Sequence, residues 1–488
     1  MNLLEILKEP ESGKPIELDP TVLELPGDLE TPVSAYLKLE SVGAKFLLES
    51  AESPKSVGRY TFIGISPTHR IDILRDCCRI EGRDGKLDIP HASDDAPFTA
   101  LRQILARISI SRDVPEMRLL GGLVGYAGYN CVSFFEPRIP FPDNRDEVLG
   151  SFYLVDTLLV FDHFSRRIKV ISLTESGNED SLRRSKELID KISAALHGPV
   201  RIPQTMAMAA NSEFVPNMKR DEFENMVEEA RKNIFAGNVF QIVTSQVFSG
   251  ETGADSFQIY RALRMLNPSP YMFYLKFDDL DLIGSSPEAL VKLEDGRAIL
   301  RPIAGTRRRG HTEEEDAMMS EELAKDEKEL AEHVMLVDLG RNDLGRICKY
   351  GSVTVPEFKK LEYYSHVIHL TSTVTGKLRD DADQFDLFRA AFPAGTVTGA
   401  PKVRAMELIN EFEPTKRGPY AGSVGYFSLS GNLDMCIAIR TIIKRGRQVS
   451  LQAGAGIVAD SVPNLEYKET LNKIAAIKEA IRIAEEGF

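Results

Sequence analysis

The sequence lacks the features that mark membrane-spanning, exported and nucleic-acid-binding proteins. No apolar run approaches the roughly 20 residues that span a bilayer, and the start, MNLLEILKEPESGKPIE, is too acidic and too polar for a signal or transit peptide. Lysine and arginine number 60 against 73 acidic residues, and the basic residues form no patch interleaved with aromatic ones. We therefore expect a cytoplasmic protein with no membrane and no nucleic-acid partner, and small molecules are its expected ligands.

Cysteine is also scarce. The chain has five cysteines, an odd number, and only Cys77 and Cys78 are adjacent. This pattern predicts neither a disulfide framework nor a zinc site. None of the five lies in a nucleophile motif, and Cys436, within an apolar β-like run, is interpreted as a small core residue.

The length of 488 residues predicts two domains or one large, closely packed unit. A stretch near residues 198–216 has no usable periodicity and carries three prolines, so we place the boundary there, between regions 1–205 and 206–488. β-like runs and helical patterns are neither regularly alternated nor grouped as a sandwich, which favours an α+β fold with a large mixed sheet. Helices are expected over 181–196, 220–237, 257–266, 314–339, 385–391, 401–411 and 464–486.

Two copies of one acidic spacing lie in the C-terminal half: Glu329 with Glu332, and Glu466 with Glu469. Residues three apart share a helix face, so each expected helix presents two carboxylates together. Two such faces can hold a Mg²⁺ ion between them, because this ion prefers oxygen ligands. The alternative is a solvated helix face, which is the common reason for this spacing.

Four glycine- or threonine-rich turns accompany these acids, at 301–310, 392–402, 417–426 and 452–461. Glycine permits close backbone approach, and exposed N–H groups in succession can bind anions. Arg440 adds a planar guanidinium that suits a carboxylate. Together with Mg²⁺ these features indicate a small substrate with more than one carboxylate, although each turn by itself could simply connect two elements.

His366 and His369 lie in an apolar β-like run, where a separation of three places them on opposite faces. They are therefore not expected to share a metal. One inward histidine would be a proton-transfer group, since histidine titrates near neutrality. The alternative is a hydrogen-bonded histidine of the core.

An ordered series of motifs resembles the chorismate-utilising enzymes, and among them the component I group of anthranilate synthases. It comprises GSSPE, PIAGTRRRG, DEKELAEHVMLVDLGRNDLGR, YSHVIHLTSTVTG, FPAGTVTGAPKVRAMELI, GPYAGSVGYF, MCIAIRT and QAGAGIVADSVPNLEYKET. The resemblance implies a chorismate-binding fold of layered β-sheets flanked by helices. It also implies amination of chorismate with ammonia, followed by elimination of pyruvate to give anthranilate, the first step of tryptophan biosynthesis.

The resemblance also assigns roles to residues. It implies Mg²⁺ bound by Glu329, Glu332, Glu466 and Glu469, and a substrate pocket formed by Gly305, Thr306, Thr396, Tyr420, Arg440, Gly454 and Gly456. Glu288 is the expected general acid for loss of the C4 hydroxyl, and His369 is the expected group that moves a proton off the ring.

Two positions distinguish among the members of the family. Water-adding enzymes carry a lysine base where this chain has Gln241, and aminodeoxychorismate synthases often carry a nucleophilic lysine where it has Ala304. Direct addition of ammonia, which needs no base to begin its attack, remains. Component I of aminodeoxychorismate synthase stays open as an alternative, because some members lack that lysine. A non-catalytic tryptophan-binding protein is the second alternative.

The source of ammonia and the regulation are also implied by the resemblance. The chain has no Gly-x-Cys-x-Gly elbow with a later histidine and glutamate, so a separate glutamine amidotransferase subunit is the expected partner in a hetero-oligomer. Region 1–205 is expected to be regulatory, with L-tryptophan as a feedback inhibitor. Its expected pocket combines Leu48, Glu49 and Ser50 with Asn267, Pro268, Pro270, Tyr271 and Met272; a buried turn is the alternative.

Overall fold

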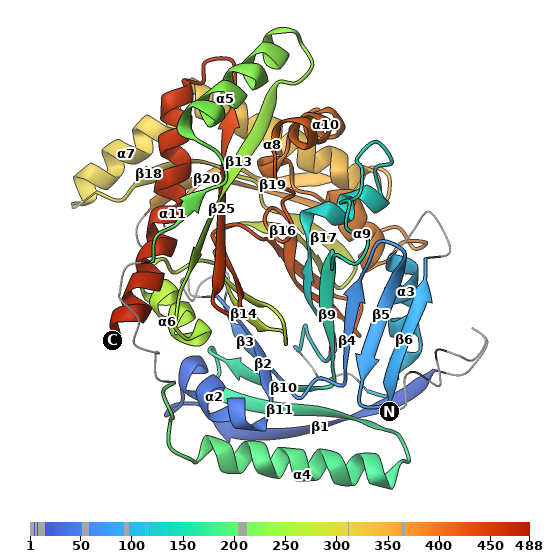
Figure 1. The fold of residues 1–488 in the computed structure, drawn as a ribbon. Coiled ribbons are helices and arrows are strands. Elements are labelled where there is room, and N and C mark those ends of the chain that lie inside the picture. The colour runs from blue at the N-terminus through green and yellow to red at the C-terminus, as the bar shows by residue number, and fades with distance from the viewer. Residues whose placement is uncertain are drawn as a thin grey trace.

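The structure, a computed structural model, is built on two large β-sheets that face each other (Figure 1). It describes residues 4, 7, 15–50, 58–91, 97–112, 114, 116–203, 212–310, 312–363 and 367–488, with only the backbone of Thr306. No helix in these ranges is both long and apolar enough to cross a membrane. The mixed α and β architecture with layered sheets confirms the fold class predicted from the sequence.

The first sheet contains strands from the N-terminal and the C-terminal parts of the chain. In spatial order its strands are β12 (Val215–Pro216), β13 (Gln241–Glu251), β25 (Gln448–Ile457), β24 (Thr441–Arg445), β15 (Asp281–Ser286), β14 (Tyr271–Lys276), β2 (Ala44–Glu49), β3 (Tyr60–Ile65), β10 (Thr157–Asp162), β11 (Arg167–Glu175), β1 (Ile16–Pro26) and β7 (Ile108–Ile110), and β21 (Gly399–Ala400) pairs with β13.

The second sheet has the same mixture of early and late strands. Its order is β18 (Ile303–Arg308), β20 (Val367–Lys377), β17 (Arg297–Leu300), β16 (Ala289–Glu294), β23 (Leu433–Ile437), β22 (Ser423–Ser428), β8 (Gly122–Ala127), β9 (Gly150–Val155), β4 (His69–Ile73), β5 (Cys77–Gly82) and β6 (Gly85–Pro90), and β19 (Thr354–Tyr363) pairs with β20.

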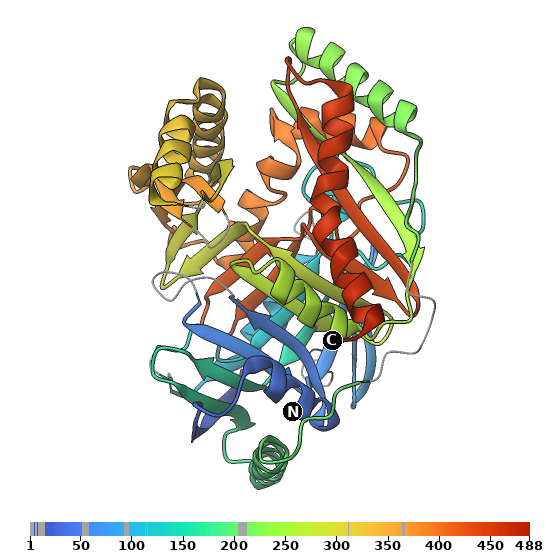
Figure 2. The same cartoon turned by 90° about the vertical axis from the view of Figure 1, so that its left-hand side faces the viewer.

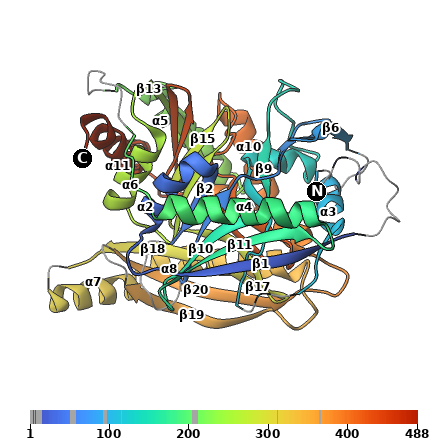
Figure 3. The same cartoon turned by 90° about the horizontal axis from the view of Figure 1, so that it is seen from below.

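Helices cover the outer faces of both sheets. α2, α4, α6 and α11 pack on the first sheet, α5 and α10 on its β13 end, and α7, α8 and α9 on the second sheet. Figure 3 shows α4 lying across β10 and β11. The helices are α2 (Pro32–Leu39), α3 (Phe98–Ala106), α4 (Glu179–Leu196), α5 (Arg220–Phe235), α6 (Ser256–Leu266), α7 (Glu313–Lys325), α8 (Glu327–Gly345), α9 (Gln384–Ala391), α10 (Lys402–Phe412) and α11 (Pro463–Glu486), with short 3₁₀ turns at Glu40–Val42, Tyr129–Phe134 and Gly395–Val397.

Strand β10 shows why both faces of the first sheet must be buried. Its side chains alternate between faces, as the extended backbone requires. Leu158 and Val160 enter the core between the two sheets, whereas Leu159 and Phe161 pack toward the outer helices with Ile192 of α4. Because all of these residues are apolar, the strand is stable only with a layer on each face.

The predicted boundary at residue 205 lies outside the described residues. On either side of it the chain contributes strands to both sheets: β2 pairs with β14 in the first sheet, and β8 pairs with β22 in the second. The two sequence regions therefore share their sheets, and their separate regulatory and catalytic roles remain a prediction.

The predicted helix over 314–339 is two helices, so this prediction is wrong in its continuity. Asp326 separates α7 from α8 and has an extended conformation, with φ −70° and ψ 101°. Its carboxylate accepts hydrogen bonds from the backbone N–H groups of Lys328 and Glu329, which makes it the N-cap of α8. A short polar side chain that bonds to the backbone in this way favours a helix start over a helix interior.

Candidate active site

Glu288 and Arg440 lie where the chain passes from one sheet to the other. Glu288 separates β15 in the first sheet from β16 in the second, and Arg440 separates β23 in the second sheet from β24 in the first. The two crossings are bonded to each other: Ile437 N–H donates to the Glu288 carbonyl at 3.0 Å, and Ser285 N–H donates to the Arg440 carbonyl at 3.2 Å. The topology therefore brings together two residues that are distant in the sequence.

The Glu288 carboxyl is suited to carry a proton near neutral pH. Burial raises its pKa to about 7, although the nearby Thr396 hydroxyl and the Arg440 guanidinium act in the opposite direction. The Thr396 hydroxyl is itself buried and has no partner of regular hydrogen-bond geometry within the described residues. Glu288 can thus donate a proton to a bound molecule at physiological pH.

His369 is positioned by an irregularity between β18 and β20. The pairing of these strands shifts between Ala304 and Thr306, which leaves Gly305 as the bulged residue with φ +68°. The Gly305 carbonyl accepts a hydrogen bond from His369 Nδ1 at 3.4 Å, so Nε2 is the basic nitrogen of the neutral ring. Burial lowers the pKa of His369, and Arg440 lowers it further.

A second part of the site lies at the end of β25. Gly454 and Gly456 stand opposite Ser245 and Val243 of β13. The N–H groups of Ser245 and Val243 donate away from β25, to Glu413 Oε1 and the Thr398 carbonyl, each at 2.8 Å. In an antiparallel ladder the N–H groups of the opposite residues then also point away from the partner strand. Gly454 and Gly456 thus present their N–H groups at the other edge of β25, beyond the last pairing with β24 at Leu451.

Tyr420 and Gln241 lie against these two glycines. A Cβ atom on Gly454 would come within 2.9 Å of the Tyr420 hydroxyl, and one on Gly456 within 2.9 Å of Gln241 Nε2. Burial raises the pKa of Tyr420 to about 12, so its hydroxyl remains a hydrogen-bond donor. Glycine is required at position 454, where a Cβ would also come within 2.7 Å of the Thr244 carbonyl. At position 456 a side chain would displace the flexible end of Gln241.

Sequence reasoning missed a buried ion pair behind the site. Arg417 donates to Glu413 at 2.6 and 2.9 Å and to the carbonyls of Val397 and Val243 at 2.6 and 2.7 Å. Only 1% of the Arg417 side chain and 4% of the Glu413 side chain are exposed. The pair therefore joins the turn that carries Thr396 to strand β13. Glu413 and Arg417 are four residues apart, but both follow the last residue of α10. No helical pattern therefore placed them together in the sequence.

We expect Arg417→Ala to lower the free energy of unfolding by about 3–5 kcal/mol, because Glu413 would remain buried without its countercharge. Urea unfolding followed by far-ultraviolet circular dichroism measures this loss. The matched control is the double variant Glu413→Gln/Arg417→Met, which removes both charges and should lose less stability. An equal loss in the two variants would show that the charge of Glu413 is not the cause.

The four predicted metal-binding glutamates lie on α8 and α11. In Figure 2 the two helices lie on opposite sides of the molecule, at the end that is remote from α4. Burial raises the pKa of both Glu332 and Glu466, the Glu469 carboxylate on α11 raises that of Glu332 further, and Lys328 lowers both. The two pairs therefore interact across the space between the helices.

A shared metal site is nevertheless not assembled. In the described ranges no three His, Cys, Asp or Glu side chains lie close enough together to hold a metal ion. Glu329 accepts from Arg307 Nη1 at 3.3 Å, and Glu469 is paired with Lys473 at 2.7 Å. The carboxylate donors suit Mg²⁺, and burial raises the pKa of two of them, Glu332 and Glu466. To share one ion, α8 and α11 would have to approach each other.

Six residues of the predicted tryptophan pocket line one cavity of about 740 Å³ between the two sheets. We call it the Ser50 cavity; its wall includes Leu48, Glu49, Ser50, Pro270, Tyr271 and Met272. Asn267 instead donates to Ser285 Oγ at 3.2 Å, and neither Asn267 nor Pro268 belongs to the wall. Among the described residues, the buried hydroxyls of Ser50 and Tyr60 have no hydrogen-bond partner, which leaves polar atoms for a ligand.

Glu49 is already engaged by the protein. Its carboxylate accepts from Tyr260 and, at 2.6 and 3.2 Å, from Arg264, both on α6. Glu49 is a candidate partner for the amino group of a bound amino acid, but its carboxylate is already paired with a cation of the protein. The side chain of Thr306 and the whole of His366 lie outside the described residues, so their predicted placement stays open.

Comparison with known proteins matches residues 46–479 to the family of chorismate binding enzymes. The chain belongs to this family, and the sequence-based prediction of a chorismate-utilising enzyme is confirmed. Anthranilate synthase component 1 of Aquifex aeolicus is 46% identical over 476 residues, which cover 96% of this chain and 95% of that protein. The protein of the same name from Acetivibrio thermocellus is 41% identical over 488 residues, with 97% of each chain covered.

A solved structure agrees with this assignment. The crystal structure of anthranilate synthase component I from Streptococcus pneumoniae TIGR4 matches with a TM-score of 0.76 and 35% identity, over 92% of this chain and 98% of the other. The similarity extends across both sheets and both sequence regions, so it concerns the whole architecture and not only the site.

Proposed function

We propose that this chain is the large subunit of an anthranilate synthase, which aminates chorismate with ammonia and then eliminates pyruvate to give anthranilate. The observation that carries the proposal is the placement of Glu288, a carboxyl with a pKa of about 7, beside Arg440 and Thr396 in a chain that resembles anthranilate synthases. Gln241 and Ala304, where related enzymes carry lysines, leave ammonia as its own nucleophile.

In the first step ammonia forms a bond to the ring, and the bond from C4 to its hydroxyl breaks. Glu288 donates its proton to the leaving hydroxyl, which departs as water. Arg440, Tyr420 and the N–H groups of Gly454 and Gly456 hold the enolpyruvyl carboxylate, and Gln241 lies beside Gly456 at the same edge. This arrangement fixes the ring relative to Glu288.

In the second step the amino intermediate loses pyruvate and becomes aromatic. Neutral His369 accepts the ring proton at Nε2, because Nδ1 is committed to the Gly305 carbonyl. The electron pair of the C–H bond completes the aromatic ring, and the bond between the ring and the enolpyruvyl oxygen breaks. The side chain leaves as the enolate of pyruvate, which takes up a proton to give pyruvate. The imidazolium that forms lies near Arg440, so the proton is readily passed on.

Glu329, Glu332, Glu466 and Glu469 would hold Mg²⁺, which withdraws charge from the ring carboxylate when bound. The raised pKa values of Glu332 and Glu466 make this binding pH-dependent, since both groups must lose their protons. We expect Mg²⁺ affinity to increase with pH and binding to release protons, which a pH indicator in weakly buffered solution detects. At a pH low enough for the two carboxyls to be partly protonated, Mg²⁺ binding without proton release would contradict the assignment.

Ammonia would come from a glutamine amidotransferase subunit, which the component 1 names of the relatives support. We propose a hetero-oligomer in the cytoplasm on this basis. The isolated chain would then work only with added ammonium.

The function is tested by anthranilate fluorescence after the chain is mixed with chorismate, Mg²⁺ and ammonium at pH about 8.5, where more of the ammonium is present as free ammonia. We expect fluorescence that EDTA abolishes. Consumption of chorismate without anthranilate would instead indicate an aminodeoxychorismate synthase, and no consumption in the presence of the amidotransferase subunit would contradict both.

The Ser50 cavity is the proposed site of feedback inhibition by L-tryptophan. Its volume suits an amino acid of this size, and the unpaired Ser50 and Tyr60 hydroxyls supply polar contacts. Tryptophan would inhibit by favouring a conformation that binds chorismate less well.

We expect Ser50→Phe to abolish tryptophan inhibition while anthranilate formation continues, because the larger ring would occupy part of the cavity. Initial rates with and without tryptophan measure this difference. A Ser430→Phe variant, on an exposed turn outside the cavity, should retain inhibition. Unchanged inhibition in Ser50→Phe would place the tryptophan site elsewhere.

A further inference from the structure

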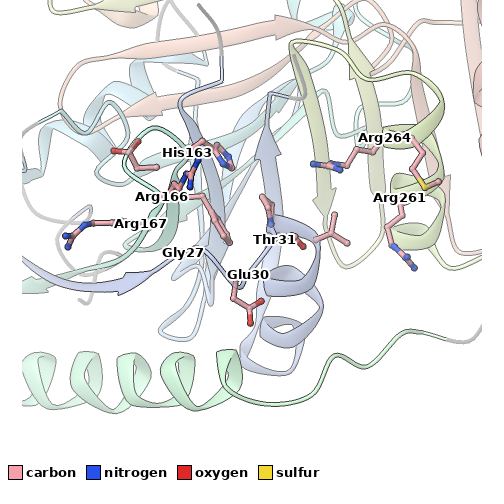
Figure 4. A pocket seen from close by; sticks show the side chains of 13 residues that line it. Gly27, Glu30, Thr31, His163, Arg166, Arg167, Arg261 and Arg264 are labelled. Carbon is pink, nitrogen blue, oxygen red and sulfur yellow. The ribbon is translucent and has the colours of Figure 1, made fainter. Parts of the chain in front are cut away.

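A second cavity, of about 420 Å³, adjoins the Ser50 cavity, since His163 and Arg166 line both. Figure 4 shows this second cavity. The start of α2, the turn between β10 and β11, and α6 enclose it. Figure 4 shows Arg166 and Arg167 on one side and Arg261 and Arg264 on the other. We call it the arginine cavity. Its volume lies in the range of small-molecule sites, about 300–1,000 Å³.

The two acidic residues that line this cavity are each paired with a cation that does not line it. The Glu30 carboxylate is paired with Lys38, and the Asp162 carboxylate accepts from Arg59 at 3.0 and 3.2 Å. Neither Lys38 nor Arg59 belongs to the wall of the arginine cavity. The two carboxylates are therefore not available to compensate the arginines.

Two of the four arginines have acidic partners and two do not. Arg264 is paired with Glu49 and Arg167 with Glu24. Within the described part of the chain, Arg261 has only the neutral Gln258 Oε1, at 2.6 Å, and the ring of Phe488. Arg166 is exposed in the turn between β10 and β11, and its side chain makes no hydrogen bond or ion pair with the described residues. Among the described residues, two of the arginines that line the cavity thus have no acidic partner.

The backbone holds Arg166 in an unfavourable conformation. Its φ of +55° lies in the left-handed region, which a residue with a long side chain adopts rarely. Gly27 N–H donates to the Arg166 carbonyl at 3.0 Å and secures this geometry. Because Arg166 is exposed, packing does not account for an arginine in this strained position, whereas a role in binding would.

We propose that the arginine cavity binds a small oxyanion, the phosphate or carboxylate group of a metabolite, between Arg166 and Arg261. The planar guanidinium offers paired donors that match both kinds of oxyanion. The start of α2 adds to the positive potential on the same wall. Arg166 also lines the Ser50 cavity, so the site adjoins the proposed tryptophan site. It includes none of the residues that act on chorismate and does not depend on the reaction proposed for them.

The test is a calorimetric titration of the full chain with inorganic phosphate and, separately, with succinate, at constant ionic strength and with chloride as the reference salt. We expect saturable binding of at least one of them, and the comparison identifies the phosphate or the carboxylate as the preferred group. Arg166→Gln and Arg261→Gln should each weaken binding about tenfold, the typical effect of losing a charged hydrogen bond.

Arg184→Gln is the matched control, because Arg184 is exposed on α4 and lies outside the cavity. It should bind like the unmodified chain. Arg166→Lys keeps the charge and should recover part of the affinity, which separates loss of the charge from a disturbed turn. Absence of binding above the chloride reference, or equal affinity in all variants, would overturn the proposal.

Discussion

Replacing Glu288 with glutamine is expected to slow chorismate consumption by about 10²–10⁴-fold, the usual contribution of a positioned general acid. Glutamine has nearly the same shape and keeps the polar contacts with Thr396 and Arg440, but it cannot donate a proton to the leaving hydroxyl. The loss should therefore appear mainly in kcat, with a smaller change in KM. Steady-state rates at a fixed concentration of free ammonia measure it.

The pH dependence of the unmodified enzyme follows from the same group. Burial raises the pKa of Glu288 to about 7, and only the protonated carboxyl can act as an acid. At constant free ammonia, the rate of chorismate consumption should therefore fall as the pH rises above about 7. The Glu288→Gln variant should lack this decrease, because glutamine does not titrate.

Glu187→Gln provides the matched control, since Glu187 is exposed on α4, away from the sheet crossings. It should retain the activity and the pH profile of the unmodified chain. If Glu288→Gln kept both the rate and the alkaline decrease, another residue would have to be the acid.

Much of this architecture could be predicted from local patterns, but the assignment of strands to sheets could not. In the sequence, the run SFYLVDTLLVF has the pattern of one β-like segment, and so does CIAIRTIIK. Each is broken into two strands that belong to different sheets, at Asp156 and at Arg440. Apolar residues on both sides of each break give no periodic signal, because every one of these strands is covered on both faces.

The candidate site could likewise be predicted only in part from the sequence. Gly454, Gly456 and Gly305 could be singled out in advance, because glycine-rich turns are visible in sequence and the structure gives each of them a close neighbour. Arg417 and Glu413 could not, since a buried ion pair between two turns depends on contacts that only the fold creates. The raised pKa of Glu288 likewise depends on burial at a sheet crossing.

His369→Ala is the second substitution expected to have a large effect, and the effect is on the product. Ammonia addition would continue, because Glu288 and the carboxylate-binding groups are unchanged. Elimination of pyruvate would slow by about 10²–10⁴-fold without the proton acceptor. Chorismate would therefore be consumed while the amino intermediate accumulates, and chromatography of the reaction mixture would show it in place of anthranilate.

The rate of this second step at acidic pH depends on the fraction of His369 in its neutral, basic form. Burial lowers the pKa of the imidazole, so the neutral ring is present at pH 7 and is lost only as the pH falls through that lowered value. Elimination should slow over this acidic range in the unmodified enzyme, whereas the much slower elimination in His369→Ala should not depend on pH there.

Added imidazole distinguishes a proton acceptor from a residue that only supports the strand. It can enter the space left by the substitution and should restore anthranilate formation from the accumulated intermediate in proportion to its concentration. His197→Ala, at the exposed end of α4, is the control and should form anthranilate at the normal rate. Normal anthranilate formation by His369→Ala would instead assign the histidine to the core of β18 and β20. Its hydrogen bond to Gly305 would then have a structural role.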